Sequence, residues 1–132
     1  MTTSTITRLT TAPTYAVLPA EDIDRARTFY LDVLGLEVSE VSSGREFFIH
    51  SGSGTKVLVY ERPRTVAEHT VLSFEVDDVH ATVAELRSRG VLFEEYDLPG
   101  LVTTDAVAEY PDSWGAWFTD PEGNIVNIVQ MK

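Results

Sequence analysis

Apolar and polar residues alternate with different periods along the chain, and each change of period predicts a new element of secondary structure. Residues 15–19 form a short apolar run typical of a strand, and the carboxylates of Glu21 and Asp22 follow, where they could cap a helix. From Ile23 onward, apolar residues recur at intervals of three, four and seven, which predicts a helix with one buried stripe that ends at Gly35. Three strands are expected next, at 36–41, 46–50 and 56–61.

The same order of elements returns in the second half, which indicates an internal repeat. A strand is predicted at 70–76, and a second helix follows it. Asp78 lies 56 positions after Asp22 at the start of that helix, and Gly90 lies 55 positions after Gly35 at its end. Strand, cap, helix and C-terminal glycine therefore recur in register.

The remainder of the second half is rich in turn signals. Strands are predicted at 92–96, 116–119 and 125–130. The loop at 97–111 is long enough to be a lid or binding loop, and it could equally be a structural excursion. Residues 120–124 have the sequence Asp-Pro-Glu-Gly-Asn, which predicts a hairpin turn between the last two strands.

These patterns predict an α+β fold made of two tandem βαβββ modules, at about 14–62 and 69–131. A length of 132 residues suits one domain, so residues 1–132 are expected to fold as a single unit. A four-stranded module cannot easily bury both faces of its sheet by itself. We therefore expect the two curved mixed sheets to pair, with helices on one face of each and a central cleft lined by the other.

Composition and charge narrow the range of partners. The formal net charge of −11 repels phosphate backbones, so we expect no nucleic acid partner, and the acidic surface either attracts a cationic ligand or only keeps the protein soluble. No window approaches the roughly 20 apolar residues of a membrane helix, and residues 1–14 lack the pattern of a signal peptide. The absence of cysteine removes thiolate chemistry. We expect a cytoplasmic protein.

Six short segments, taken together, resemble the glyoxalase, bleomycin-resistance and extradiol dioxygenase group, which is the vicinal oxygen chelate superfamily. They are residues 18–22, 25–30 and 33–36 in the first half, and 74–79, 86–90 and 120–124 in the second. The resemblance spans about 15–129 and implies the paired-module fold. The superfamily includes lyases, isomerases, dioxygenases, thiol transferases and drug-sequestering proteins, so the function has to be inferred from the site.

The resemblance also implies where a divalent metal would be held, and this sequence lacks the ligands. The His of the first strand corresponds to Tyr15, the His of the second module's first strand to Val71, and the Glu of the last strand to Asn127. A fourth ligand would fall near Val57 or Val59. Valine has no lone pair and an amide is a poor replacement for a carboxylate, so we expect no metal and no other cofactor.

Other residues could still form a ligand-binding cleft. Tyr15 and Asn127 could hydrogen-bond an uncharged polar ligand, or they could satisfy each other in a filled core. Trp117 could stack on a planar ligand or pack in the core, and in a strand it must face the opposite way from Phe118. His69 precedes Val71 by two residues and is either a lone imidazole of the cleft or a solvated residue at a strand entrance. The predicted cleft residues are Tyr15, His69, Val71, Trp117 and Asn127.

Two functions of different classes follow. The first is a metal-free small-molecule-binding protein of the glyoxalase/bleomycin-resistance type that sequesters a cationic or aromatic compound. The alternative is a glyoxalase-like lyase, isomerase or dioxygenase, with an atypical metal set around His69 or metal-free acid–base chemistry at Tyr15. A partner-binding or regulatory domain with a filled cleft is a third interpretation.

The resemblance further implies a homodimer, and two-fold pairing is the commonest arrangement of copies.

Overall fold

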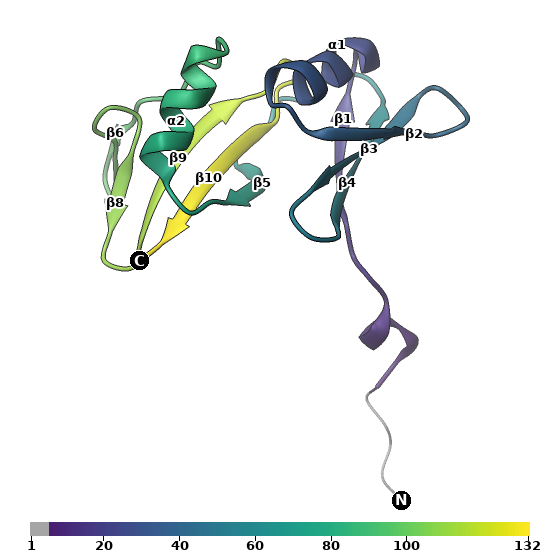
Figure 1. Cartoon of the computed structure of the whole chain (residues 1–132), viewed down its shortest axis with the longest axis horizontal. Helices are drawn as coiled ribbons and strands as arrows, with labels where there is room; N and C mark the ends of the chain where they lie inside the picture. Colours follow the sequence, from purple (N-terminus) through teal and green to yellow (C-terminus); the bar gives the residue numbers. More distant parts are fainter. Residues whose placement is uncertain (1–5) are drawn as a thin grey trace, which may run out of the picture.

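A computed structural model describes residues 6–132 and contains two four-stranded sheets of identical topology (Figure 1). Each sheet joins its first strand in parallel to its last strand, and the remaining strands are antiparallel. Sheet one has the order β1 (Ala16–Ala20), β4 (Thr55–Glu61), β3 (Glu46–Ser51), β2 (Glu37–Glu40). Sheet two has the order β5 (Thr70–Glu75), β10 (Ile125–Met131), β9 (Ser113–Thr119), β8 (Ala108–Tyr110). The predicted α+β fold with two tandem modules is confirmed.

Both helices begin at the residues that the sequence indicated, and each helical run ends before the glycine expected to follow it. Helix α1 (Ile23–Thr28) starts at Asp22 and helix α2 (Val79–Ser88) at Asp78, and each aspartate Oδ1 accepts a 3.0 Å hydrogen bond from a first-turn backbone amide. The glycine after each helix has a positive φ, 72° at Gly35 and 92° at Gly90. A π-helical turn, η2 (Phe29–Val33), extends α1, because Leu34 N–H bonds to the carbonyl oxygen of Phe29.

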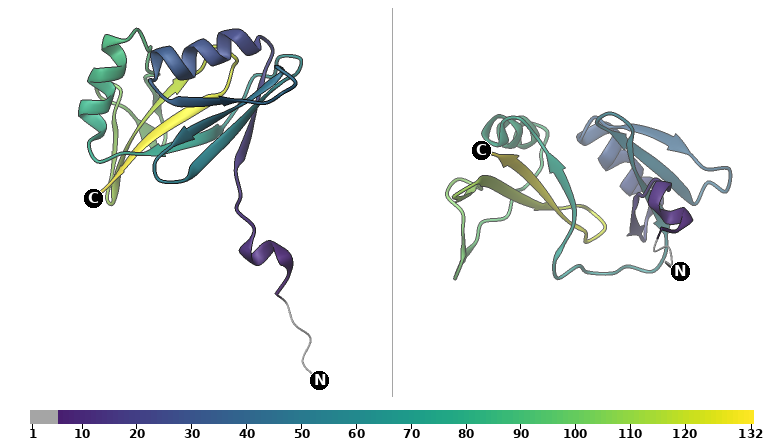
Figure 2. Two further views of the ribbon diagram at one scale, coloured as in Figure 1. Left: turned by 45° about the vertical axis from the view of Figure 1, so that its right-hand side comes forward. Right: turned by 90° about the horizontal axis from the view of Figure 1, so that it is seen from below.

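Each module buries its own apolar cluster between its helix and its sheet. In module one the cluster includes Leu18, Tyr30, Phe47 and Val59, and in module two it includes Val83, Phe118, Val126 and Ile128. Phe29, Leu34 and Leu72 pack against both clusters and therefore join the two modules. Figure 2 shows the chain between β4 and β5 crossing from one sheet to the other on the side away from the helices.

The segment at 97–111 is more regular than the sequence indicated. It contains a short ribbon, β6 (Asp97–Leu98) with β7 (Leu101–Val102), and then β8, which completes sheet two. The strand expected at 92–96 is instead an irregular segment with one bridge, Phe93 to Phe118. The expectation of one long loop was wrong, because Ala106, Val107 and Ala108 are buried against the rest of module two. This burial depends on residues distant in sequence, so the local turn residues give no sign of it.

The turn at 120–124 connects the modules as well as closing the expected hairpin. Asp120 Oδ1 accepts hydrogen bonds of 2.9 Å from the backbone amides of Glu122 and Asn124. The Asn124 side chain donates a 3.0 Å bond to the Pro19 carbonyl on β1. The Glu122 carboxylate, only 1% exposed as a residue, accepts 2.6 and 3.1 Å bonds from the Arg25 guanidinium of α1. The turn is therefore a polar clamp between the two modules.

A 3₁₀ turn, η1 (Arg8–Thr11), precedes β1 and lies apart from both modules (Figures 1 and 2). Within residues 6–132, no helix is long and apolar enough to cross a membrane.

Candidate functional site: the open faces of two sheets

The face of each sheet opposite its helix, here called the open face, carries the candidate binding residues. In sheet one, Val57 and Val59 are buried in the core under α1, so the intervening Leu58 points to the open face. Near the position expected for the family's fourth metal ligand, Leu58 is thus the side chain on the open face, because the side chains of a strand alternate between faces. Leu58 also offers no donor atom to a metal.

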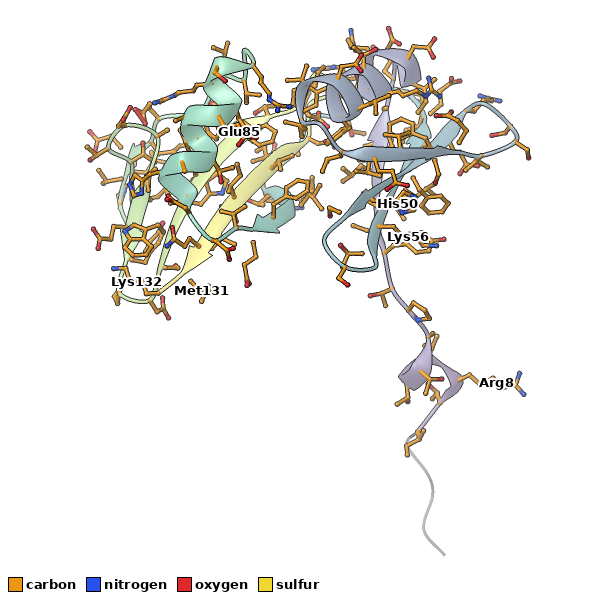
Figure 3. All side chains as sticks on the ribbon, in the orientation of Figure 1. Arg8, His50, Lys56, Glu85, Met131 and Lys132 are labelled. Atoms are coloured by element: carbon orange, nitrogen blue, oxygen red, sulfur yellow. The ribbon has the colours of Figure 1, made fainter. Side chains whose placement is uncertain are left out.

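Tyr15 lies at the entrance to β1, 44% exposed, with its ring edge-on to Phe48 at 5.4 Å between centroids. The Lys56 ammonium lies over both rings, 4.6 Å from the Phe48 centroid and 5.2 Å from the Tyr15 centroid. Figure 3 shows Lys56 and His50 on the same part of module one. We call Tyr15, Phe48 and Lys56 the aromatic–lysine cluster. It already holds one cation against two aromatic faces.

Trp117 lies on the open face of sheet two, directly opposite Asn127 of β10 in the strand register. Its indole N–H donates a 3.2 Å hydrogen bond to Thr70 Oγ1, and the Tyr96 ring meets it edge-on at 5.8 Å. The adjacent Phe118 is fully buried on the helix side, so the two neighbours face opposite ways as expected. Partial burial, and then the Glu94 carboxylate, raise the pKa of the Tyr96 phenol, which keeps it neutral at physiological pH.

The Asn127 side chain is occupied by partners within module two. Its Oδ1 accepts a 3.0 Å bond from Ser73 Oγ, and its Nδ2 donates to the carbonyl oxygens of Ala116 and Ile128 at 3.2 and 3.3 Å. The residue as a whole is 9% exposed. The interpretation in which Tyr15 and Asn127 satisfy each other is therefore wrong.

His69 and Val71 come together at the junction of the modules. They line a hollow of about 380 Å³ with Pro19 of β1, Asn124 of the clamp and residues 65–68. The adjacent Thr70 accepts the indole hydrogen bond of Trp117, so this hollow borders the open face of sheet two. Its lining is mostly apolar, and the His69 imidazole and the Glu68 carboxylate supply its ionisable groups.

The five predicted residues thus fall in three places. Tyr15 lies on sheet one, Trp117 and Asn127 form a cross-strand pair on sheet two, and His69 and Val71 line the hollow between the modules. Sequence reasoning missed Phe48 and Lys56. The signal for them was the alternation along two adjacent strands, which places Phe48 opposite Leu58 and Lys56 opposite His50.

The side chains at the family's metal positions do not fit a divalent ion. Those positions hold a phenol, two aliphatic side chains and an amide whose oxygen and nitrogen are already hydrogen-bonded. Over residues 6–132, no three His, Asp or Glu side chains gather closely enough to hold a metal ion. His50 is hydrogen-bonded to Ser39 Oγ at 2.7 Å, away from the hollow that His69 lines.

The family model for the Glyoxalase/Bleomycin resistance protein/Dioxygenase superfamily matches residues 12–128. A search of curated proteins gave no match. Among solved structures, a lactoylglutathione lyase from Agrobacterium tumefaciens is 26% identical, with coverage of 91% of this chain and 93% of the other and a TM-score of 0.64. TnmS3, an antibiotic binding protein from Streptomyces sp. CB03234, is 23% identical, with coverage of 92% and 98% and a TM-score of 0.68. A glyoxalase/dioxygenase from Nostoc punctiforme is 17% identical, with coverage of 100% and 99% and a TM-score of 0.70.

Proposed function

The chain belongs to the Glyoxalase/Bleomycin resistance protein/Dioxygenase superfamily, and we propose that it is a metal-free protein that binds and sequesters a planar aromatic small molecule. The observation that carries this proposal is the presence of aromatic side chains on the open faces, beside positions where the family's metal ligands are missing. Tyr15 stands at a metal position on sheet one beside Phe48, and Trp117 stands opposite the metal position Asn127 on sheet two.

Aromatic side chains in such positions support stacking more than hydrogen bonding. Flat rings gain from offset or edge contact with another flat ring and lose little conformational entropy on binding. The polar groups around Trp117 are largely hydrogen-bonded already. The Trp117 indole N–H bonds to Thr70, and the Ser73 hydroxyl bonds to Asn127. A ligand with an extended ring system therefore suits this surface better than a sugar or a peptide.

The charge of the ligand follows from the aromatic–lysine cluster and the overall acidity. Two rings that hold the Lys56 ammonium can hold another cation in its place, and the net charge of −11 favours the approach of a cation. A planar aromatic cation is thus the best-matched ligand class. TnmS3 is an antibiotic binding protein, which is in keeping with the proposal that this chain binds a small molecule.

Tryptophan fluorescence can test the proposal, because the chain has only two tryptophans. The Trp114→Phe variant leaves Trp117 as the sole reporter on the open face. Titration with 9-aminoacridine, a planar cation, should then give saturable quenching, whereas tetramethylammonium, a cation without a ring, should give none. Trp117→Leu should weaken 9-aminoacridine binding measured by calorimetry. Absence of saturable binding to 9-aminoacridine, to the planar anion 2-naphthoate and to bleomycin would refute the proposal.

The second candidate, a glyoxalase-like reaction, is supported by the lactoylglutathione lyase at 26% identity. It would use Tyr15 or His69 as an acid–base group. Its test is formation of lactoylglutathione from the methylglyoxal–glutathione hemithioacetal, with and without added nickel or zinc. Activity that Tyr15→Phe or His69→Ala reduces would favour this function over sequestration.

We also propose that the protein is a cytoplasmic homodimer. Strand β1 is an edge strand of sheet one, and it presents Val17, 50% exposed, on the open face next to Tyr15. Open faces with exposed apolar side chains are characteristic of surfaces that another subunit covers. Sedimentation velocity over a range of concentrations tests this state directly.

A further inference from the structure

An apolar pocket lies on the helix side of the molecule, on the far side of sheet two from its open face. It has a volume of about 140 Å³ and opens at the seam where α2 meets the chain that follows η2, and we call it the seam pocket. Most of its lining is apolar and comes from both modules. Leu34 and Leu36 belong to module one, and Phe74, Val76, Phe118 and Ile128 belong to module two.

Helix α2 leaves this space open because it presents polar side chains to the seam. Its buried stripe packs on sheet two, while Thr82 and Glu85, three residues apart on a neighbouring face, line the seam pocket. The Thr82 hydroxyl donates a 2.8 Å hydrogen bond to the Asp78 carbonyl oxygen inside the helix, so it needs no ligand. A ligand that fills the space would gain dispersion and hydrophobic energy from the apolar atoms opposite.

The volume of the seam pocket sets the size of that ligand. An apolar cavity of about 150 Å³ lined by leucine, isoleucine and phenylalanine can stay dry and bind benzene. The seam pocket has nearly this volume and the same kinds of side chain. One aromatic ring therefore fits the pocket, whereas a system of three fused rings is too large for it.

Glu85 sets the charge of the ligand. Figure 3 shows Glu85 on α2, on the side toward module one, where it lines the pocket. Its nearest cation in the described part of the chain is the Arg89 guanidinium, at 3.9 Å, and Arg89 instead donates a 3.3 Å hydrogen bond to the Val33 carbonyl oxygen across the seam. The Glu85 carboxylate is thus able to accept hydrogen bonds from an ammonium group beside an apolar pocket.

We propose that the seam pocket is a second ligand site, which binds a primary arylalkylamine with one aromatic ring. The ring occupies the pocket and the ammonium group contacts Glu85. The net charge of −11 favours the approach of such a cation. This site is separate from the open faces, so the proposal does not depend on the ligand that those faces bind. Because both modules line the pocket, the bound amine also stabilises their packing.

NMR of labelled methyl groups tests the site in the full chain. Titration with benzylamine should shift the methyl signals of Leu36, Val76 and Leu86 saturably and raise the Tm by a few degrees. Benzyl alcohol, a neutral molecule of the same size, should bind about threefold more weakly, as expected for loss of one exposed ion pair. The three-ring 9-aminoacridine should leave these methyl signals unchanged, whether or not it binds the open faces.

A matched pair of variants tests the role of Glu85. Glu85→Gln should abolish the preference for benzylamine over benzyl alcohol and leave the affinity for benzyl alcohol unchanged. Glu75→Gln is the control, because Glu75 lies between two lining residues in sequence but is exposed on the other face of the strand. It removes the same charge and should preserve the preference.

Three results would overturn the proposal. They are the absence of saturable shifts with benzylamine, shifts confined to residues around Trp117 on the open face, and an equal loss of preference in Glu85→Gln and Glu75→Gln. Each of them leaves the proposed binding of a planar ligand to the open faces untouched, since that function is measured by Trp117 quenching with 9-aminoacridine.

Discussion

The Tyr30 hydroxyl donates a 2.6 Å hydrogen bond to Asp120 Oδ2, and this bond joins the first module to the turn that closes the second. Both side chains are buried, and the other oxygen of Asp120 organises the backbone of the turn. Two other residues of the turn make hydrogen bonds to module one: the Glu122 carboxylate to Arg25 and the Asn124 side chain to the Pro19 carbonyl oxygen. Polar contacts between residues 90 or more positions apart therefore join the two modules, in addition to the apolar side chains that pack against both clusters.

Loss of the Tyr30 hydroxyl should destabilise the protein. Tyr30→Phe keeps the ring in the apolar cluster but removes one of the two side-chain donors to Asp120 Oδ2, which leaves Asn124. We expect a loss of about 1–3 kcal/mol in the free energy of unfolding, measured by urea denaturation. Tyr60→Phe is the control, because the Tyr60 hydroxyl only accepts a 3.3 Å bond from Arg62 at the surface. Equal effects of the two variants would contradict the clamp.

Acid should weaken the same clamp through Glu122. Burial opposes ionisation of this carboxyl, but hydrogen bonds from Arg25 and from the Asp22 amide outweigh it and lower the Glu122 pKa below its ordinary 4.5. A carboxyl with a lowered folded-state pKa contributes stability above pH 4.5, and this contribution is lost as pH falls through the folded-state value. At pH values below 4.5, the urea concentration at the unfolding midpoint should therefore decrease more steeply with falling pH in wild type than in Glu122→Gln. Glu61→Gln, which breaks the surface pair with Arg45, should retain the wild-type slope.

Alkaline pH should act through Tyr30. Burial, and then the charge of Asp120, raise the pKa of the Tyr30 phenol well above its ordinary 10.0. An acid whose pKa is raised on folding stabilises the folded state fully below pH 10.0, and this stability declines as pH rises toward the folded-state value. Denaturation midpoints between pH 9 and 11 should fall less in Tyr30→Phe than in wild type. A parallel decline would show that other groups dominate.

Lys56 should compete with a cationic ligand for the rings of Tyr15 and Phe48. Removal of its charge in Lys56→Gln should tighten 9-aminoacridine binding by a few fold and weaken that of 2-naphthoate, as expected for a cation–π contact of about 0.5–1 kcal/mol. Lys132→Gln is the matched control, since Lys132 lies 4.6 Å from the Trp114 ring on the other module. The same response in both variants would mean that only overall charge matters.

Metal binding should be weak. Protein purified without a tag or chelator and then titrated with zinc, nickel, manganese and iron should contain far less than one equivalent by elemental analysis, because the metal positions hold Tyr15, Val71 and Asn127. Near-stoichiometric tight metal would contradict the proposed ligand-binding function and favour glyoxalase-like chemistry.

The sequence alone determined the elements whose cause is local. Asp22 and Asp78 cap helices through their own first turns, Gly35 and Gly90 adopt a backbone conformation that glycine tolerates, and the repeat of these signals indicates two modules. Side-chain alternation was also enough to separate Trp117 from Phe118.

Only the tertiary structure decided what depends on distant partners. Strand β8 forms where Ala108 and the two residues before it are buried against module two, and the clamp exists because Tyr30 and Asp120 meet across 90 positions. The same holds for the site: the predicted residues lie on three surfaces because sheet register and module packing, not spacing along the chain, place Tyr15, Trp117 and His69. Local free-energy preferences fix caps and strands, whereas these positions are fixed by burial and hydrogen bonds that form only after the modules assemble.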